Sequence, residues 1–219
     1  SGLIPIKQAL LIMAVLLVAV LALATQLNLA FQLILGIYFV STVLYSMFFK
    51  SLAILDVCVL ASLYTLRVIG GGVAIGAEWS FWLLAFSMFF FISLALAKRV
   101  SELTNIKTGD SEWIRGRGYQ VGDLPVLINA GVSSGLLSIL VVALYINADK
   151  VLQMYAFPQL LWLICPLLLY WIGRVWIITT RGLMHEDPIL FAIRDRVSLL
   201  TVLCGALVVV SAVFLPVSF

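Results

Sequence analysis

The sequence predicts an all-α fold: a polytopic transmembrane helix bundle of about seven spans, forming a single membrane domain over residues 1–219. Of its residues 64% are hydrophobic and only 11% are charged, whereas a soluble domain carries about 25% charged residues. Apolar runs of about 20 residues, the length that a spanning helix needs, occupy most of the chain. The net charge of +3 does not indicate a nucleic-acid partner, and we expect the surroundings to be membrane lipid.

Seven apolar runs are expected to form the spans, in this order: Ile6–Ala24, Leu27–Phe49, Leu52–Gly76, Trp79–Ala97, Leu124–Ile146, Pro158–Thr180 and Val197–Phe214. Two longer polar stretches, Lys98–Asp123 and Arg181–Arg196, separate them. All three cysteines fall inside apolar runs, which favours small apolar fillers over disulfides or a metal site.

The positions of Lys and Arg predict which side of the membrane each loop faces. Ten of the 13 fall on one side if the N-terminus is cytoplasmic: Lys7, Lys50, Lys98, Arg99, Lys107, Arg115, Arg117, Arg181, Arg194 and Arg196. Only Lys150 lies on the other side, and Arg67 and Arg174 fall within spans. Because Lys and Arg concentrate in cytoplasmic loops, this pattern predicts that the charged, active face lies in the cytoplasm.

Lys50 and Asp56 are the first candidate site residues. Lys50 ends the second run and is either an anchor at the membrane surface or a phosphate ligand. Asp56 lies one turn into the third run, and a short carboxylate side chain reaches the interface poorly, which favours a catalytic or metal-binding role.

Arg67 is the most deeply placed charge and follows Asp56 by eleven residues, which returns it to the same helix face. The two are separated by roughly 16 Å along the helix, so we expect them to face one polar cavity without touching. Tyr64 lies one turn before Arg67, and both are candidate catalytic residues. Alternatively, Arg67 binds backbone carbonyls at a helix break, because Gly70–Gly72 follow it.

Lys98, Arg99 and Glu102 follow the fourth run. Lys98 and Glu102 share a helix face at i and i+4, which fits either a simple ion pair or a phosphate and metal site. The basic loop Arg115–Tyr119 is predicted to close over an anionic headgroup, although such loops also bind ordinary acidic lipids.

The last polar stretch predicts a short surface helix. Ile189, Leu190 and Ile193 form an apolar face, Pro188 suits the first helical position, and Asp187 lies near the start. We assign Asp187 to the same lid or cap as Arg117 and Tyr119, and we leave the single histidine, His185, unassigned.

These segments resemble the UbiA superfamily of intramembrane prenyltransferases. The resemblance spans the chain and rests on YSMFFK leading into LDV, LYTLRVIGGGVAIG, SFWLLAFSMFFFISLALAKRVSEL, the GRGY loop, ALYIN and MHEDPILFAIRDRVSL. It is greatest for the branch that contains decaprenyl-phosphate phosphoribosyltransferase and related bacterial proteins of unassigned substrate, which implies a location in the bacterial inner membrane. The resemblance implies a nine-helix bundle around a cavity open to lipid, with a magnesium-bound diphosphate held by two acidic motifs.

Several features depart from that pattern. The first acidic motif of the family has no counterpart here, and Ser1-Gly2 resembles the end of the stretch that follows that motif. We therefore expect this chain to lack the first two family helices and to pack against them as part of the same protein. The second acidic motif is replaced by Lys98-Arg99 and Glu102, which leaves fewer metal ligands.

The resemblance nevertheless implies a Mg²⁺-dependent transferase that acts on a polyprenyl lipid. It would transfer either a prenyl group to an acceptor or phosphoribose to polyprenyl phosphate. Phosphate binding is expected from Lys50, Lys98, Arg99 and Arg115, and metal contact from Asp56 and Glu102.

Two other functions stay open. A non-catalytic lipid or ion transporter would also place charges inside spans, although its polar residues would be expected along both halves of the membrane. An inactive fragment is the other alternative, because the first acidic motif is absent.

Overall fold

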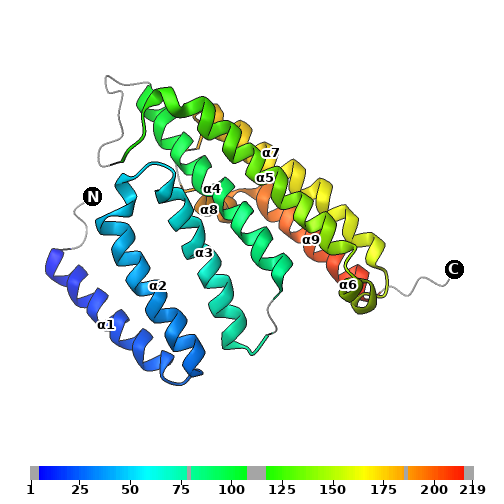
Figure 1. Ribbon diagram of the computed structural model, residues 1–219, viewed down its shortest axis with the longest axis horizontal. Helices are drawn as coiled ribbons and strands as arrows, with labels where there is room; N and C mark the ends of the chain where they lie inside the picture. Colours follow the sequence, from blue (N-terminus) through cyan, green and yellow to red (C-terminus); the bar gives the residue numbers. More distant parts are fainter. Residues whose placement is uncertain (1–4, 78–79, 108–116, 185–186, 215–219) are drawn as a thin grey trace.

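The computed structural model describes residues 5–77, 80–107, 117–184 and 187–214, and its regular elements are helices (Figure 1). Seven of the described helices are long and apolar enough to cross a membrane, which confirms the predicted fold class. The α-helices are α1 (Ile6–Ala24), α2 (Leu29–Met47), α3 (Leu55–Ala74), α4 (Phe81–Lys107), α5 (Leu124–Ile146), α6 (Asp149–Met154), α7 (Ile164–Thr180), α8 (Pro188–Arg194) and α9 (Arg196–Phe214). Three short 3-10 helices join them: η1 (Phe49–Ser51), η2 (Val121–Asp123) and η3 (Pro158–Leu163).

The main error in the predicted boundaries concerns α4, which was expected to end at Ala97 but continues to Lys107. The prediction stopped at the first charged residues. The helix continues because Val100 and Leu103, both fully buried, still face the core, while the neighbouring Arg99 and Glu102 form ion pairs. The charged residues from Lys98 to Glu102 therefore lie on a helix face and not in a loop.

A hydrogen-bonding residue, Asn28, joins the start of α2 to the end of α3. The Asn28 side chain accepts a hydrogen bond from the Phe31 N–H at 2.8 Å and so caps α2. The amide of Asn28 also donates to the Val73 carbonyl at 2.9 Å, near the end of α3. One residue thus begins a helix and ties it to its antiparallel neighbour.

Helix α4 lies at the centre of the bundle, between α3 on one side and α5 and α7 on the other (Figure 1). Gly131 and Gly135 on α5 permit the close approach of α7. A Cβ at Gly131 would lie 2.2 Å from the Trp176 ring, and one at Gly135 would lie 2.7 Å from Ile172. The spacing of these two glycines, four residues apart, predicts a helix-packing surface, and the structure confirms it. The same spacing of Gly72 and Gly76 predicts a second such surface, but this prediction is wrong, because a Cβ at either position meets nothing within 4 Å.

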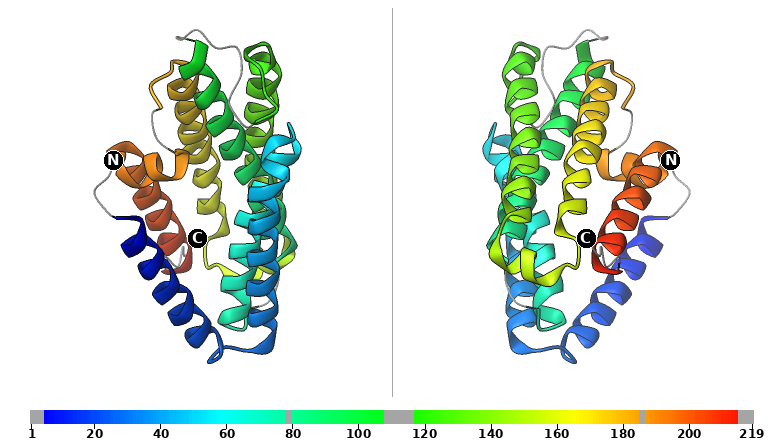
Figure 2. Two further views of the ribbon diagram at one scale, coloured as in Figure 1. Left: turned by 90° about the vertical axis from the view of Figure 1, so that its left-hand side faces the viewer. Right: turned by 90° about the vertical axis from the view of Figure 1, so that its right-hand side faces the viewer.

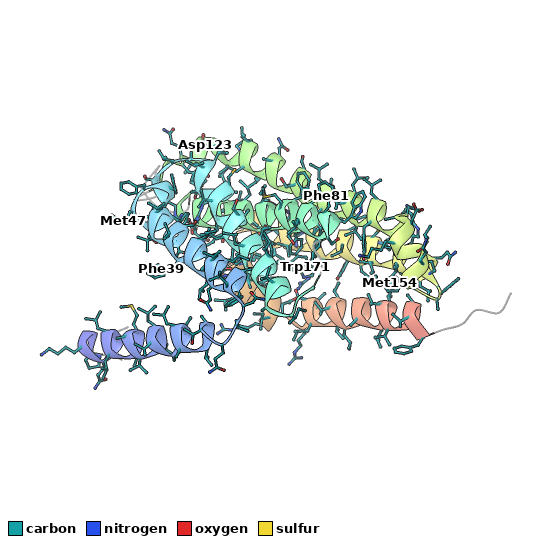
Figure 3. The ribbon with its side chains drawn as sticks, turned by 60° about the horizontal axis from the view of Figure 1, so that its bottom comes forward. Phe39, Met47, Phe81, Asp123, Met154 and Trp171 are labelled. Carbon is teal, nitrogen blue, oxygen red and sulfur yellow. The ribbon has the colours of Figure 1, made fainter. Side chains whose placement is uncertain are left out.

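The two ends of the bundle differ in character. Met47, at the end of α2, and Asp123, just before α5, lie at one end, while Met154 lies at the other (Figure 3). We call the first the charged end. Helices α1 and α9 lie on the side of the molecule away from α2 and α5 (Figure 2). Among the described side chains of α1 only Ala24 is buried, so this helix presents apolar side chains almost all round.

Candidate active site

Arg99 on α4 forms the centre of a polar cluster at the charged end. Its side chain is 1% exposed, and its Nε donates to Asp56 Oδ2 at 2.7 Å. Its Nη1 donates to both oxygens of Glu102, each at 2.7 Å, and its Nη2 donates to the Tyr45 hydroxyl at 3.2 Å. Side chains of α2, α3 and α4 thus meet on one guanidinium, whose planar fork suits two carboxylates.

Asp56 is held by an unusual turn at the start of α3. Ile54 has φ +65°, a left-handed conformation that β-branched residues rarely adopt. The Tyr119 hydroxyl accepts a hydrogen bond from the Ile54 N–H at 2.7 Å and donates to Asp56 Oδ1. Tyr119 therefore fixes both the strained turn and the carboxylate that follows it.

Gly118 allows Tyr119 to reach this turn. A Cβ at Gly118 would lie 2.7 Å from the Ser51 carbonyl oxygen and 3.1 Å from the Ala53 nitrogen. The segment before α5 can therefore lie directly on the connection between α2 and α3 only if this residue is glycine. Burial and the hydrogen bond to Asp56 raise the pKa of Tyr119, which keeps its hydroxyl protonated and able to donate.

Arg117 adds a second cation to the same carboxylates. Its Nε lies 3.2 Å from Glu102 Oε2, and its Nη1 lies 3.5 Å from Asp56 Oδ2 and 3.4 Å from the Tyr45 hydroxyl. We use "Arg99 cluster" for Tyr45, Asp56, Arg99, Glu102, Arg117 and Tyr119. Its two arginines balance its two carboxylates, so this buried group is electrically neutral as a whole.

Lys98 forms an ion pair that the sequence did not predict. Of the two alternatives for Lys98 and Glu102, the simple ion pair between them is wrong: Lys98 Nζ binds Asp187 Oδ2, while Glu102 binds Arg99 and Arg117. Asp187 also accepts a hydrogen bond from the Ile189 N–H at 3.0 Å, which caps α8. The predicted short helix that begins at Pro188 is confirmed, and Lys98 links it to α4.

Arg67 and Tyr64 form no hydrogen bond or ion pair with the Arg99 cluster among the contacts of the described residues. Arg67 donates to the Tyr38 hydroxyl, from Nε at 3.1 Å and also from Nη2, and its guanidinium lies over the Tyr38 and Tyr64 rings. The alternative that Arg67 binds carbonyls at a helix break is not what the structure shows, because α3 continues unbroken to Ala74. Lys50 lies exposed in η1, and Arg115 lies outside the described residues.

Sequence analysis missed Tyr38 and Tyr45 as site residues. They lie seven residues apart on α2, which places both on one face and opposite the arginines of α3 and α4. The seven-residue spacing of the two tyrosines could therefore have identified them from the sequence. The pairing of Asp56 with Arg99 could not be predicted from spacing, because the two residues belong to different helices and meet only through tertiary packing.

Two apolar cavities lie along α4 and α7. One of about 360 Å³ is lined by residues that include Phe91, Leu94 and Trp171, with Ile189 of α8 at its edge. The other, of about 400 Å³, lies towards the opposite end of the bundle, and the two share Ile164 and Leu168 in their walls. Leu94 is one turn from Lys98, so apolar space begins close to the charged end.

The side chains at the charged end offer few ligands for a metal ion. In the parts of the chain that the structure describes, no group of three His, Cys, Asp or Glu side chains could hold a metal ion. Glu102 is 30% exposed and fits as one oxygen ligand beside substrate phosphates, which is how Mg²⁺ is often held. Asp56 is fully enclosed by Arg99, Arg117 and Tyr119, and so it fits such a role less well.

These features define a polytopic helical membrane protein whose ionisable side chains gather at one end of the bundle, next to apolar cavities. Residues 1–191 match the UbiA prenyltransferase family, and the chain belongs to that family. Membership supports a membrane transferase of the prenyltransferase kind, from a family that acts on polyprenyl lipids and generally uses divalent metals.

Two curated relatives are similar to the chain. One is the Uncharacterized protein y4nM of Sinorhizobium fredii, 36% identical over 200 residues, or 90% of this chain and 39% of the relative. The other is the Nodulation protein NoeC of Azorhizobium caulinodans, 33% identical over 154 residues, or 70% of this chain and 50% of the relative. The chain therefore matches half or less of the length of either protein.

Proposed function

We propose that this chain carries the charged end and much of the lipid cavity of an intramembrane transferase that acts on a polyprenyl phosphate or diphosphate. The observation that carries the proposal is that the charged end adjoins an apolar cavity. Lys98 lies one turn from Leu94 in the wall of the 360 Å³ cavity, and its partner Asp187 begins α8, which also lines that cavity. A polyprenyl lipid has the same two parts, an anionic headgroup and a long apolar chain.

Two reactions share this chemistry. In prenyl transfer, the C1–O bond of a polyprenyl diphosphate breaks and C1 forms a bond to an acceptor. In phosphoribosyl transfer, an oxygen of polyprenyl phosphate bonds to C1 of phosphoribosyl diphosphate as the C1–O bond to diphosphate breaks. Both release a diphosphate, so both need positive charge where the leaving group departs.

The residues of the charged end have distinct parts in this proposal. Lys98, one third exposed, and Lys50 bind phosphate oxygens, whereas Arg99 is enclosed and positions Asp56 and Glu102. Arg117 and Tyr119 enclose Asp56 together with Arg99. Helix α8 covers the end of the 360 Å³ cavity that is nearest the charged end. Mg²⁺, when bound, would neutralise the leaving diphosphate, with Glu102 as a protein ligand.

We also propose that two further helices of the same protein pack against the exposed face of α1, which would complete the nine helices that the family resemblance implies. The membrane is the bacterial inner membrane, and the charged end faces the cytoplasm. The distribution of Lys and Arg supports this orientation.

A parallel assay tests the proposed function. The complete parent protein in nanodiscs with Mg²⁺ would receive radiolabelled polyprenyl phosphate plus phosphoribosyl diphosphate in one reaction. A second reaction would contain polyprenyl diphosphate plus a hydroxylated aromatic acid. A labelled product in either reaction supports the proposal and identifies the donor, whereas no product in both would favour the transporter alternative or an inactive protein.

A further inference from the structure

Arg67 differs from the other arginines that lie within spans. Arg99 is paired with Asp56 and Glu102, and Arg174 holds Asp195 through two hydrogen bonds of 2.6 and 2.9 Å. Across the described residues, Arg67 makes no ion pair, and the one side-chain acceptor that it contacts is the neutral Tyr38 hydroxyl. A guanidinium has five N–H donors, so most of them are left for another ligand.

The position of Arg67 deep in the membrane makes the lack of an ion-pair partner energetically costly. It lies twelve residues beyond the start of α3, or roughly 18 Å along the helix, beyond the middle of a hydrocarbon core about 30 Å thick. An unpaired charge near the membrane centre costs roughly 2.5–3.5 kcal/mol on insertion scales. The two tyrosine rings, with centroids 5.2 and 5.0 Å from the guanidinium, offset part of that cost.

A small cavity lies beside the unpaired guanidinium. It has a volume of about 220 Å³, lies between α2 and α3, and is lined by Phe31, Tyr38, Arg67, Gly71 and neighbouring apolar side chains. Among the described residues that line it, Arg67 is the one that carries a charge. The missing side chain at Gly71 leaves room next to Arg67, because a Cβ there would meet nothing within 4 Å.

The same pairing of arginine with tyrosine occurs at two depths along α2. Tyr45 accepts from Arg99 within the Arg99 cluster, and Tyr38, two turns further along the same face, accepts from Arg67. Seven residues correspond to a separation of about 10 Å. This face of α2 therefore meets a guanidinium at each of two levels, Arg99 of α4 at Tyr45 and Arg67 of α3 at Tyr38.

We propose that Arg67, with Tyr38 and Tyr64, binds an oxyanion of a substrate about 10 Å deeper in the bundle than the Arg99 cluster. This inference rests on the proposed function and narrows it: one substrate carries a phosphate or carboxylate that is separate from the diphosphate that leaves. Both groups accept two N–H bonds from the planar guanidinium fork. A phosphorylated sugar donor and an aromatic acid acceptor each meet this requirement.

The test measures thermal stabilisation of the complete parent protein in phosphatidylcholine nanodiscs. Inorganic phosphate and benzoate are titrated separately, with excess inorganic diphosphate present to compete for any site at the charged end. We expect one of the two probes to raise the Tm of the wild type. Arg67→Gln should weaken that response at least tenfold, whereas Arg67→Lys should retain part of it.

Arg181→Gln is the matched control, because Arg181 is exposed and lies just outside its span. It should respond to the probe as the wild type does. An unchanged response in Arg67→Gln would overturn the inference, and so would the absence of a response to both probes in the wild type. A response to phosphate indicates a phosphorylated substrate, and a response to benzoate indicates an aromatic acid.

Transfer assays separate this inference from the proposed function. With the substrate that matches the responding probe, Arg67→Gln should raise KM at least tenfold, whereas Arg181→Gln should leave it unchanged. If the wild type is active and Arg67→Gln has the same KM, the oxyanion site is refuted but the proposed function is not. If the wild type makes no product but still shows the Arg67-dependent Tm response, the proposed transferase function is refuted but the oxyanion site is not.

Discussion

Replacing Arg99 should destabilise the protein mainly because Asp56 loses its close ion pair in the core and keeps only the longer contact to Arg117, at 3.5 Å. Arg99 is 1% exposed and Asp56 is fully buried, and their side chains meet at 2.7 Å. Removing one partner of a buried pair costs about 3–5 kcal/mol when the remaining charge has neither water nor a counterion. Arg117 offsets part of that cost for Asp56, so we expect Arg99→Leu to lower the free energy of unfolding by about 3 kcal/mol, the lower end of that range.

A double-mutant cycle identifies the cause. Asp56→Asn in the Arg99→Leu background removes the buried carboxylate charge but retains an amide that can bind Tyr119. If burial of a carboxylate without its close partner Arg99 dominates, the double variant should be more stable than Arg99→Leu alone. The coupling between the two changes should exceed about 1 kcal/mol, within the range for residues in one network.

Unfolding by sodium dodecyl sulfate in mixed micelles, followed by tryptophan fluorescence, provides the measurement. Arg99→Lys is the conservative control: it retains the charge but not the fork, and it should be intermediate in stability. Effects of Arg99→Leu and Asp56→Asn that simply add, with coupling below about 0.5 kcal/mol, would refute the claim that the two side chains form one buried unit.

Three further changes test other contacts. Tyr119→Phe should lower stability by about 1–3 kcal/mol in the same unfolding assay, because it leaves the Ile54 N–H without its acceptor and Asp56 with one donor fewer. Gly131→Ala should lower the Tm, because its Cβ would overlap the Trp176 ring, and overpacking costs about 1–3 kcal/mol. The contribution of Asp195 should disappear in acid: hydrogen bonding from Arg174 lowers the pKa of this carboxyl, so its stabilisation is present above the usual pKa of about 3.9 and is lost as pH falls through the lowered value.

Each of these changes has its own control. Gly205→Ala on α9 meets nothing within 4 Å and should be neutral or slightly stabilising; a loss equal to that of Gly131→Ala would contradict the packing argument. Asp195→Asn should narrow the difference in Tm between pH 7 and pH 3, and an unchanged difference would exclude the ion pair as its source. Wild-type stability in Tyr119→Phe would show that the hydroxyl is not needed to hold Ile54.

The sequence was sufficient for the spans because length and hydropathy act locally. Each predicted run corresponds to a membrane-length helix, and the surface helix beginning at Pro188 followed from its apolar spacing and its cap. The end of α4 was misplaced because a charged residue near a membrane normally marks a boundary. Here Arg99 and Glu102 remain helical, since their partners come from α3 and from Arg117.

The candidate site was predictable as a set of residues but not as a set of contacts. Charge at unusual depth singled out Asp56 and Arg67, yet their shared helix face gave no indication that one is enclosed in a neutral cluster and the other is unpaired. The role of Tyr119 depends on a left-handed turn at Ile54, which no residue preference predicts for a β-branched side chain.

Turnover of Glu102→Gln tests the central claim most directly, because Glu102 is the partly exposed carboxylate of the Arg99 cluster. The complete parent protein would be assayed in nanodiscs with whichever donor gives product, alongside Asp56→Asn and with Arg181→Gln as control. We expect Glu102→Gln and Asp56→Asn each to lower kcat sharply while membrane insertion stays normal, and Arg181→Gln to match the wild type. Normal turnover in both cluster variants would contradict the assignment of the active site to the charged end.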